Sequence, residues 1–441
     1  MMKVLFISQD LVGGNIAYLL KNQQYTVKLF IRDRGRRENF DNLVDKSWNW
    51  RKDINELSKD RDLVIFDCNE FGSVQDRLRD IGYSVFGSSA KGDLLEIDRQ
   101  YAQKILSKSG VKVLPIYNFT SINQAIGFIK KNKSEWVIKQ NNEGTGQKSL
   151  NYVGLLKNAE DAIDTLTNYK KYITKKSTNI SLQRKVKGIE IAVGRFFNGK
   201  EWVGPVQLNM EHKKLFPGNL GPTTSEMGTL AWYNQSEENK LYKKTLSKLK
   251  SYLTKVNYRG YVDVNCIINE DGVFPLEITA RFGSPIVHLQ TEIHQSPWGE
   301  FLKAVADGKP YNLKWKKGYG IVVVVTVPTS NPFPFTKAER YVSPKGLNIY
   351  FREDFTDEDM KHVHFEDVSM KIVKGKKQYY ISDDRGYVLY VTGMGKTVEE
   401  ARKKTYKIIE KIIIPKMFYR NDIGLKFIES DQAKLKKWGY L

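Results

Sequence analysis

The sequence predicts an α/β protein built from two or three domains, and three observations support this fold class. The chain has 441 residues, which is more than one ordinary hydrophobic core accommodates. Short apolar runs that are typical of strands alternate with helical patterns through the first third. No internal repeat or low-complexity linker separates the parts, so we expect the domains to interlock.

The first third begins with a regular alternation of elements. Strands are expected at 3–8, 25–31, 62–68 and 83–87, with helices at 13–23 and 71–82 between them. This alternation favours a parallel sheet flanked by helices. Gly13 and Gly14 follow the first strand as in a dinucleotide-binding loop, but the complete G-x-G-x-x-G pattern is absent, so a tight turn is the simpler interpretation.

The middle of the chain contains a glycine-bearing hairpin. In "EWVIKQNNEGTGQKSLNYVG" a strand, a polar loop and a second strand follow one another, and no Walker P-loop pattern is present. Such a hairpin can lie over a triphosphate as a mobile flap, and an ordinary hairpin is the alternative. Further helices are expected at 93–110, 236–256 and 397–413. The stretch between 181 and 330 is rich in strands, and a strand at 318–328 begins the last third of the chain.

The composition is that of a folded chain, with 41% hydrophobic and 12% aromatic residues. No run of about 18 apolar residues predicts a transmembrane helix, and the start lacks the features of a signal peptide. Cys68 and Cys266 lie far apart in strand-like contexts, which favours buried thiols over a disulfide or a metal site. We therefore expect a cytoplasmic protein without a membrane partner.

The formal net charge is +21, from 71 basic and 50 acidic residues. A lysine-rich, solvated surface is the simplest explanation, and binding of small phosphorylated ligands comes second. Nucleic acid comes last, because no basic stretch is interleaved with the regularly spaced aromatics of a stacking surface.

A second hairpin carries the residues best suited to bind a metal. "YVDVNCII" and "VFPLEITA" are joined by "NEDG", whose Asp-Gly pair is typical of a hairpin turn. Alternate residues share a face, so Asp263 lies beside Asn265 and Glu277 beside Thr279, and pairing is expected to bring the two carboxylates together. Such oxygen ligands suit magnesium bridged to phosphates, with solvated carboxylates as the alternative. Arg281 offers a planar donor for a carboxylate or phosphate, or an ordinary ion pair.

Four segments follow one another along the chain: "YSVFGSSAKGDLLEIDRQYAQKIL", "EHKKLFPGNLGPTTSEMG", "PLEITARFGSP" and "MFYRNDIG". Together they resemble the ATP-grasp superfamily and, within it, the glycinamide ribonucleotide synthetases (phosphoribosylamine–glycine ligases). The first is similar to the segment that enters the ATP-grasp domain, and the second to the D-H-K-R and G-P-N-T-G-G-M-G signature. The third resembles the metal-binding E-F-N-x-R-F-G-D-P-E, and the fourth a closing Y-R-x-D-I-G motif. The resemblance runs nearly end to end and rests on the order and spacing of these motifs.

The resemblance implies an ATP-grasp fold of three domains. These are an N-terminal Rossmann-like domain at 1–95, an ATP-grasp domain at 96–318 with a mobile lid near 115–182, and a C-terminal mixed α/β domain at 319–441. It also implies ATP as a cofactor together with magnesium, or manganese in its place. In this chemistry a carboxylate attacks the γ-phosphate to give ADP and an acyl phosphate, and an amine then displaces phosphate to form an amide.

The resemblance also implies roles for individual residues. The expected nucleotide contacts are Arg99, Lys139, Gly144 and Gly146 at the phosphates, Gln183, Lys185 and Val186 near adenine, and Glu190 at the ribose. Asp263 and Glu277 would bind the metal, with Asn265 and Thr279 beside them. Arg281 and Lys213 would hold the reacting carboxylate and the transferred phosphoryl group. The loop at 211–228 would close over the acyl side, and the expected substrate contacts are His212, Lys214, Thr223, Thr224, Ser225, Gly13 and Gly14.

The departures from the family pattern lie on the acceptor side. The first glycine loop, G-x-G-G-R-E-H-A, is here "SQDLVGGNIAYLL", without the Arg-Glu-His group. Ser284 and Ile286 replace the acids of G-D-P-E, and Tyr387 replaces the arginine of G-G-R-V-L. Thr279 stands where the metal-binding asparagine is expected, and Glu226 is inserted in the acyl loop.

These differences predict an ATP-dependent carboxylate–amine ligase that joins an amino acid such as glycine to an amine other than phosphoribosylamine. An authentic phosphoribosylamine–glycine ligase of purine biosynthesis is the first alternative. A non-catalytic nucleotide- or nucleic-acid-binding protein of the same fold is the second. The expected partners are small molecules, an amino acid and an amine with or without a phosphate, and both a monomer and a dimer remain open.

Overall fold

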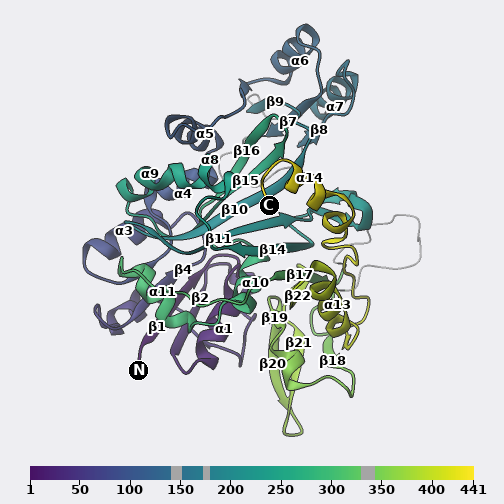
Figure 1. The fold of residues 1–441 in the computed structure, drawn as a ribbon. Coiled ribbons are helices and arrows are strands. Elements are labelled where there is room, and N and C mark those ends of the chain that lie inside the picture. The colour runs from purple at the N-terminus through teal and green to yellow at the C-terminus, as the bar shows by residue number, and fades with distance from the viewer. Residues whose placement is uncertain (141–150, 172–178, 329–342) are drawn as a thin grey trace.

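The computed structural model describes residues 1–140, 151–171, 179–328 and 343–441. Figure 1 shows an N-terminal α/β unit and the C-terminal strands at the base, a long central sheet above them, and an upper lobe. The N-terminus lies at the base and the C-terminus beside the central sheet (Figure 1). Among the described residues, no helix is long and apolar enough to cross a membrane.

A five-stranded parallel sheet, in the order β3-β2-β1-β4-β5, forms the N-terminal unit and confirms the predicted α/β class. Its strands are β1 (Lys3–Ser8), β2 (Thr26–Ile31), β3 (Asp45–Lys46), β4 (Leu63–Phe66) and β5 (Val85–Phe86), with α1 (Gly14–Asn22), α2 (Trp50–Asp53) and α3 (Gly72–Asp80) beside them. Val4 and Phe6 enter the main hydrophobic core, whereas Leu5 and Ile7 enter a second one. Both faces of β1 are therefore buried, as in parallel sheets generally.

The central sheet is antiparallel and has eight strands, in the order β16-β15-β10-β11-β14-β17-β22-β19. In chain order these are β10 (Ile189–Asn198), β11 (Trp202–Glu211), β14 (Gly228–Asn234), β15 (Arg259–Asn269), β16 (Gly272–Thr279), β17 (Tyr319–Thr326), β19 (Val363–Phe365) and β22 (Tyr387–Gly395). The helices α10 (Ile286–Ile293), α11 (Trp298–Ala306) and α13 (Val398–Ile409) contact its strands. The domain boundary predicted at 318–319 falls between strands of this one sheet, and the domain limits stay predictions.

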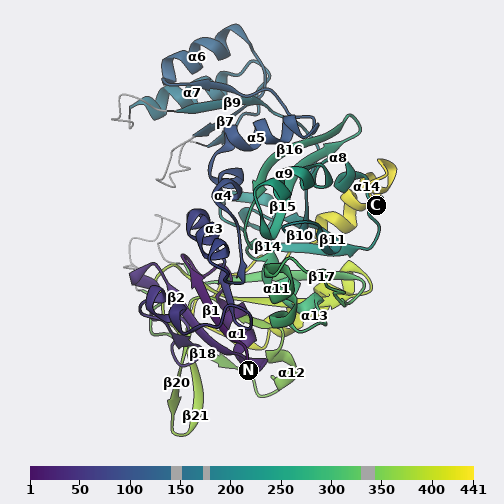
Figure 2. The ribbon, with the colours of Figure 1, turned by 90° about the vertical axis from the view of Figure 1, so that its left-hand side faces the viewer.

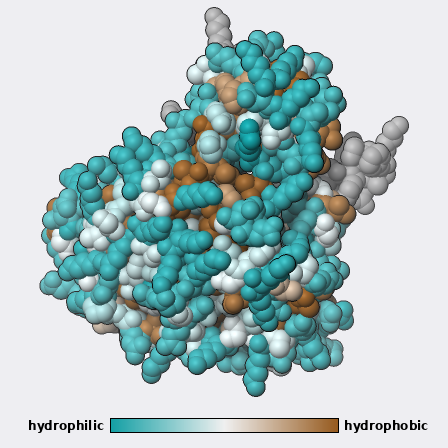
Figure 3. Space-filling model, turned by 45° about the horizontal axis from the view of Figure 1, so that its top comes forward, coloured by the Kyte–Doolittle hydropathy of each residue, from teal (hydrophilic) through white to brown (hydrophobic). Residues whose placement is uncertain are grey.

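The upper lobe has its own small sheet, in the order β6-β9-β7-β8. Its elements are β6 (Tyr117–Phe119), α6 (Ile122–Lys131), β7 (Trp136–Gln140), β8 (Tyr152–Val153), α7 (Glu160–Lys170) and β9 (Ile180–Arg184). A separate core that includes Ile129, Trp136 and Leu182 holds it together. Figure 2 shows the lobe projecting from the body, and Figure 3 shows apolar residues gathered between the two.

The last third adds a four-stranded sheet at the base, in the order β20-β21-β18-β23. Its strands are β18 (Asn348–Phe351), β20 (Val368–Val373), β21 (Lys376–Ile381) and β23 (Ile412–Ile413). The last third also contains α12 (Asp357–Met360) and, beside the central sheet, α14 (Gln432–Lys437) (Figure 1). The helix predicted at 397–413 ends earlier, because α13 stops at Ile409 and the chain continues into β23.

Two other predicted helices are broken in the structure. The helix expected at 93–110 divides into α4 (Ala90–Ile97) and α5 (Arg99–Lys108), because Asp98 is extended and its side chain caps α5 by accepting the Tyr101 N–H. The helix expected at 236–256 divides into α8 (Lys240–Lys244), a 3₁₀ turn and α9 (Lys250–Lys255). The first break places Arg99 at the start of a helix, facing the site described next.

Candidate active site

The predicted hairpin forms from β15 and β16, and its register gathers oxygen-bearing side chains on one face. Asp263 pairs with Thr279, and Asn265 pairs with Glu277. A register shift follows Asn265. Without this shift Asp263 would face Ile278 across the hairpin, whereas the shift makes Asp263 and Glu277 diagonal neighbours on the same face, as the sequence predicted.

Lys213 is the centre of a cluster of carboxylates. Its Nζ lies 3.1 Å from Glu190 Oε1, 3.0 Å from Glu211 Oε2 and 3.1 Å from Glu277 Oε1. Burial alone would lower the pKa of Lys213, but Glu211, Glu277 and Glu190 raise it well above its usual value. Lys213 is thus a permanent positive charge at the point where three strands bring their glutamates together.

Asn265 links two of these glutamates through hydrogen bonds of its amide nitrogen. Its Nδ2 donates to Glu190 Oε1 at 2.8 Å and to Glu211 Oε2 at 3.2 Å. Its Oδ1 is buried and has no hydrogen-bond partner among the described residues. Glu211 was not predicted from the sequence, although its place two residues before Lys213 on an extended chain was a usable signal.

A second set of cations faces Glu277 from α5 and β7. Burial, then Arg99 and Lys213, lowers the pKa of Lys139 to about 7, against the opposing effect of Glu277 and Glu190. Lys213 foremost, with Lys139 and Arg99, lowers the pKa of Glu277 to about 2, although burial opposes this. Arg99 Nη1 is buried without a hydrogen-bond partner in the described part of the chain. A buried guanidinium N–H in this position is suited to bind an anion.

The hairpin face also has the oxygen atoms that a hard divalent cation requires. Asp263 is 3% exposed, and burial, then Glu211 and Glu96, raises the pKa of its carboxyl well above the usual value. Its Oδ1 has no hydrogen-bond partner among the described residues, as is true of Asn265 Oδ1. Glu277 keeps 44% of its side chain exposed. These donors fit Mg²⁺ or Mn²⁺, although no closed group of three His, Cys, Asp or Glu ligands occurs in the described ranges.

Arg281 is fixed at the end of β16 by a carboxylate that the sequence did not single out. Its Nη2 lies 3.1 Å from Glu96 Oε1, and its Nη1 donates to the Phe282 carbonyl oxygen at 2.6 Å. Glu96 Oε2 also accepts the Ala280 N–H at 2.8 Å. The last turn of α4 therefore orients the guanidinium next to the metal-suited face.

The loop at 211–228 is a small ribbon raised beside Lys213. Its strands are β12 (Lys214–Phe216) and β13 (Leu220–Thr223), and Lys214 pairs with Thr223. The Lys213 carbonyl oxygen accepts both the Thr224 N–H at 2.7 Å and the Thr224 hydroxyl at 3.0 Å. Thr223 and Ser225 are exposed, so the predicted hydroxyl groups lie on an accessible rim.

His212 points away from this cluster, toward the closing motif near the C-terminus. Its Nε2 lies 3.3 Å from the Gly424 backbone nitrogen, which donates to it. Burial foremost, then Arg420, lowers the pKa of His212 to about 4, so the ring is neutral. His212 thus joins the loop to the C-terminal segment, whereas the resemblance implies a substrate contact.

The same C-terminal motif supports the loop from below. Arg420 is fully buried, and its Nη1 donates to the Lys214 carbonyl oxygen at 2.9 Å and to Asn219 Oδ1 at 3.1 Å. Asp422 accepts from Arg420 at 2.7 and 2.8 Å and from the Gly218 N–H at 2.9 Å. The Y-R-x-D-I-G resemblance therefore corresponds to a support for the loop, which sequence reasoning did not foresee.

The residues expected near adenine lie where the upper lobe meets the body. Gln183 is 5% exposed on β9, and the half-buried Lys185 donates to the Gly154 carbonyl oxygen at 3.2 Å. Val186 follows in the connection to β10 and is half-buried. Gly144 and Gly146, with the rest of the predicted flap, lie outside the described residues.

The acceptor-side residues cluster where the N-terminal unit meets the last third. Gly13 donates its N–H to Asp67 Oδ2 at 2.8 Å, and Gly14 begins α1. Asn15 Oδ1 accepts the Phe365 N–H at 3.0 Å. Ser284 Oγ lies 3.3 Å from the Tyr390 hydroxyl. The predicted site residues thus form two groups, one around Lys213 and one around Gly13.

Comparison with known families defines the class of this enzyme. Residues 97–287 match the family described as phosphoribosylglycinamide synthetase, ATP-grasp (A) domain, and residues 339–426 match its C domain. Together these matches span more than half of the chain. The chain belongs to the ATP-grasp ligases related to phosphoribosylglycinamide synthetase, which form a C–N bond between a carboxylate and an amine and release ADP.

Within this class, the similar proteins include named phosphoribosylamine–glycine ligases. Those of Caldanaerobacter subterraneus and Clostridium acetobutylicum are 24% and 25% identical over 358 and 381 residues, covering 80% and 84% of this chain and 81% and 84% of theirs. The crystal structure of a phosphoribosylamine–glycine ligase from Thermotoga maritima has a TM-score of 0.68 at 20% identity, covering 96% of this chain and 100% of that one. A Campylobacter jejuni biotin carboxylase has a TM-score of 0.61 at 12% identity, covering 99% of each chain, and confirms the fold.

Proposed function

We propose that this protein is a cytoplasmic, ATP- and magnesium-dependent ligase that joins an amino acid such as glycine to an amine other than phosphoribosylamine. The observation that carries the proposal is the arrangement of charged groups around Lys213. Three glutamates converge on its ammonium group, while the neighbouring Arg99 has a buried N–H without a hydrogen-bond partner in the part of the chain that the structure describes. This arrangement provides positive charge for a polyphosphate and carboxylate oxygens for a cation within one site.

The nucleotide would lie between the upper lobe and the central sheet. Arg99 and Lys139 would bind its phosphates beneath the predicted flap. Gln183, Lys185 and Val186 would frame adenine, and Glu190 would accept the ribose hydroxyl groups. Support comes from the low pKa of Lys139, since an ammonium group without enough anionic neighbours gains most from a bound phosphate.

The metal ion would be bound by Glu277 and Asp263, with Asn265 and Thr279 beside them. When bound, a divalent cation would neutralise phosphate charge during transfer. Side chains of the protein would orient the substrates and stabilise the developing charge. Arg281 would orient the amino acid carboxylate, and Lys213 would stabilise the negative charge of the transferred phosphoryl group. The ribbon at 211–228 would cover the acyl side, where the incoming amine displaces phosphate.

The direct test is ADP release from purified protein with ATP, Mg²⁺ and a panel of amino acids, each with and without a panel of amines. We expect ADP formation that depends on one amino acid and one amine, together with a product whose mass equals the pair minus water. Absence of ADP with every pair would contradict the proposal.

An authentic phosphoribosylamine–glycine ligase remains the second candidate, because the similar proteins are named so. The kcat/KM for glycine with phosphoribosylamine separates the two candidates. A value of about 10⁴ M⁻¹s⁻¹ or more, in the ordinary range for enzymes acting on their own substrates, would assign this chain to purine synthesis.

A further inference from the structure

The ammonium group of Lys213 is surrounded by oxygen atoms in the way that a bound cation is. Its Nζ donates to Glu190 Oε1 and to Glu277 Oε1, each at 3.1 Å, and lies 3.0 Å from Glu211 Oε2. An ammonium group has three N–H donors, so three carboxylate oxygens at these distances leave it none for a phosphate. Lys213 must therefore leave this position before it contacts the transferred phosphoryl group.

The three glutamates are positioned by the central sheet, whereas Lys213 is not. Glu190 belongs to β10, Glu211 ends β11 and Glu277 belongs to β16. The sheet order β16-β15-β10-β11 places these strands close together, and Asn265 on β15 donates to both Glu190 and Glu211. Lys213 lies between β11 and β12. It is therefore the member of the cluster that is able to leave.

The cluster is open to solvent, so a small ion can reach it. The side chains of Glu277, Glu190 and Lys213 are 44%, 39% and 28% exposed. On the same hairpin face, Asp263 Oδ1 and Asn265 Oδ1 have no hydrogen-bond partner within the described ranges. Once the ammonium group had left, Glu277 and these oxygen atoms would be available to a divalent cation.

The number of carboxylates argues against a purely structural ion pair. Three of them face one ammonium group, and Glu211 has no role in the function proposed above. Arg99 and Lys139 add positive charge beside Glu277, but they are the groups suited to the phosphates. Carboxylates in excess of their counter-charges cost free energy. Such an excess is expected where a more highly charged cation binds at another stage.

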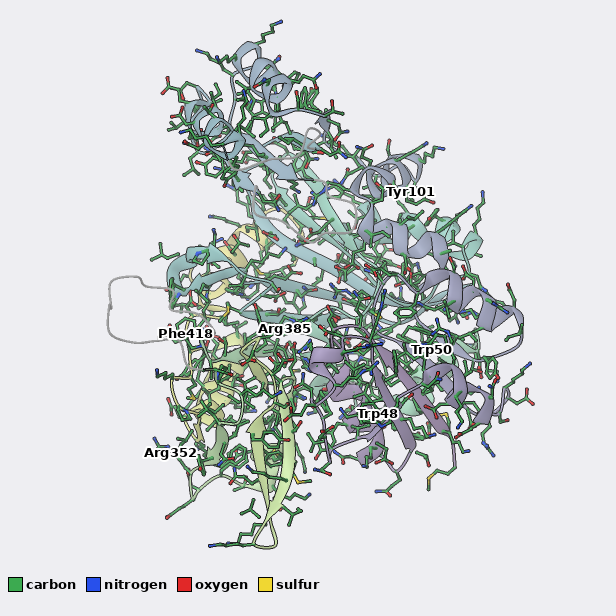
Figure 4. The ribbon with its side chains drawn as sticks, turned by 180° about the vertical axis from the view of Figure 1, so that it is seen from behind. Trp48, Trp50, Tyr101, Arg352, Arg385 and Phe418 are labelled. Carbon is green, nitrogen blue, oxygen red and sulfur yellow. The ribbon has the colours of Figure 1, made fainter. Side chains whose placement is uncertain are left out.

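The backbone around Lys213 is held in place, so the side chain is the part that moves. The Lys213 carbonyl oxygen accepts two hydrogen bonds from Thr224. Phe216 of the ribbon packs edge-to-face against Phe418 (labelled in Figure 4), with ring centroids 5.7 Å apart. The four-carbon stem of lysine is flexible. We therefore expect the ammonium group to leave by rotation of the side chain alone.

We infer that in the free enzyme the Lys213 ammonium group takes the place of the divalent cation at Glu277, until a nucleotide draws the ammonium group to its phosphates; the inference rests on the ligase function proposed above. In that function Glu277 serves the metal ion and Glu190 the ribose, and Lys213 engages both beforehand. Cation and nucleotide therefore bind cooperatively, and each raises the affinity for the other by the same factor.

The first experiment measures Mn²⁺ binding by electron paramagnetic resonance, without nucleotide. We expect Lys213→Met to bind Mn²⁺ about tenfold or more tightly than the wild-type protein, within the usual range for coupling between two ligands. The reason is that the carboxylates lose the internal cation that repels the metal ion. Equal affinities of the two proteins, or no Mn²⁺ binding by either, would overturn the inference.

Lys411→Met is the matched control. Lys411 also pairs with two carboxylates, Asp359 at 3.0 Å and Asp354 at 3.4 Å, and it lies outside the site. The variant has the same change of net charge and also leaves carboxylates without their cation. We expect it to bind Mn²⁺ as the wild-type protein does. A gain equal to that of Lys213→Met would show that net charge alone causes the effect, and would contradict the inference.

A measurement on the wild-type protein covers the case in which Lys213→Met does not fold. Lysine acylation by a succinimidyl ester, followed by mass spectrometry of the peptides, reports how accessible each ammonium group is. Saturating Mn²⁺, without nucleotide, should increase the labelling of Lys213 and leave that of Lys411 unchanged. Unchanged labelling of Lys213 would show that the metal ion does not replace it.

Neither experiment uses a substrate or measures turnover, so the two proposals fail separately. Tighter Mn²⁺ binding by Lys213→Met with no ADP release from any pair would support the exchange at Glu277 and contradict the ligase. ADP release together with equal Mn²⁺ affinities would support the ligase and overturn the exchange.

Discussion

The surroundings of Lys213 and those of Gly13 use charge in opposite ways. Near Lys213 the unsatisfied group is a cation, since Arg99 Nη1 is buried and has no hydrogen-bond partner among the described residues. Near Gly13 the unsatisfied group is a carboxyl, since Asp67 Oδ1 is buried and has no partner within the described ranges either. The net charge of +21 therefore does not indicate whether either site favours an anion or a cation. What each site selects depends on which charges its own residues leave unpaired.

The acceptor side is most easily disrupted at Arg36. Arg36→Met leaves the buried Asp367 and Asp383 and the partly buried Glu366 around an apolar side chain, so we expect a loss of about 3–5 kcal/mol in the free energy of unfolding. Urea unfolding followed by circular dichroism measures it. Arg34→Met is the control, because Arg34 is exposed in the same turn and should change stability little. Equal stability of the two variants would show that the acidic cluster does not need its arginine.

On the nucleotide side, Glu277→Gln removes one carboxylate from the Lys213 cluster and from the proposed metal site. We expect kcat for ADP formation to fall by about 10²–10³, in line with the loss of one electrostatic group from an active site. The fold should persist, because Glu277 is nearly half exposed. Glu270→Gln, on an exposed residue at the turn of the same hairpin, should retain activity. Wild-type turnover in Glu277→Gln would remove this residue from the site.

The pH dependence of ATP binding tests the role of Lys139, whose pKa is lowered. Because that pKa is lowered to about 7, the side chain of the free enzyme loses its proton as the pH rises through 7. ATP binding should then take up a proton, and the Kd for ATP should rise by at most about tenfold per pH unit above 7. Lys139→Arg, which stays protonated, should flatten this profile. Fluorescence titration between pH 6 and 9 distinguishes the outcomes, and identical profiles would contradict the assignment.

The smallest effect is expected from loosening the loop at 211–228. Asp422→Asn weakens the charge-assisted bonds to Arg420 and to the Gly218 N–H, so the loop should become more susceptible to proteolysis. We expect KM for the amino acid to rise a few-fold (about 1 kcal/mol or less) with kcat nearly retained. The control is Asp354→Asn, which changes an exposed carboxylate elsewhere in the last third. Asp431 is not used because its side chain is buried. A fall in kcat alone would argue that Asp422 acts on the chemistry.

Local patterns predicted much of this molecule. The alternation through residue 87 gave the parallel sheet, and the Asp-Gly turn gave the hairpin with its oxygen-bearing face. The register shift after Asn265 was not predicted, although Pro275, which pairs with Cys266 at the shift, was a usable signal, because proline within a strand is typical of bulges and edge strands. The break at Asp98 could have been read as a helix cap, since aspartate favours that position.

Long-range partners escaped prediction for a different reason. Arg36 lies more than 300 residues from Asp367 and Asp383, and Arg420 about 200 residues from the loop that it supports. A single sequence contains no record of which distant charges meet. Asp67 was interpreted as part of a strand, and its hydrogen bond with the Gly13 N–H, 54 residues away in the chain, appears only in the structure.

The continuous central sheet has a consequence for how this chain is synthesised. β17, with the sequence "YGIVVVVT", pairs on one side with β14 and on the other with β22, which begins at residue 387. While the ribosome has not yet released that part of the chain, β17 is an apolar edge strand with unpaired backbone groups, a known template for aggregation. A fragment ending before residue 387 should therefore precipitate or require a chaperone. The central sheet is protected from aggregation only after β22 has been synthesised and has paired with β17.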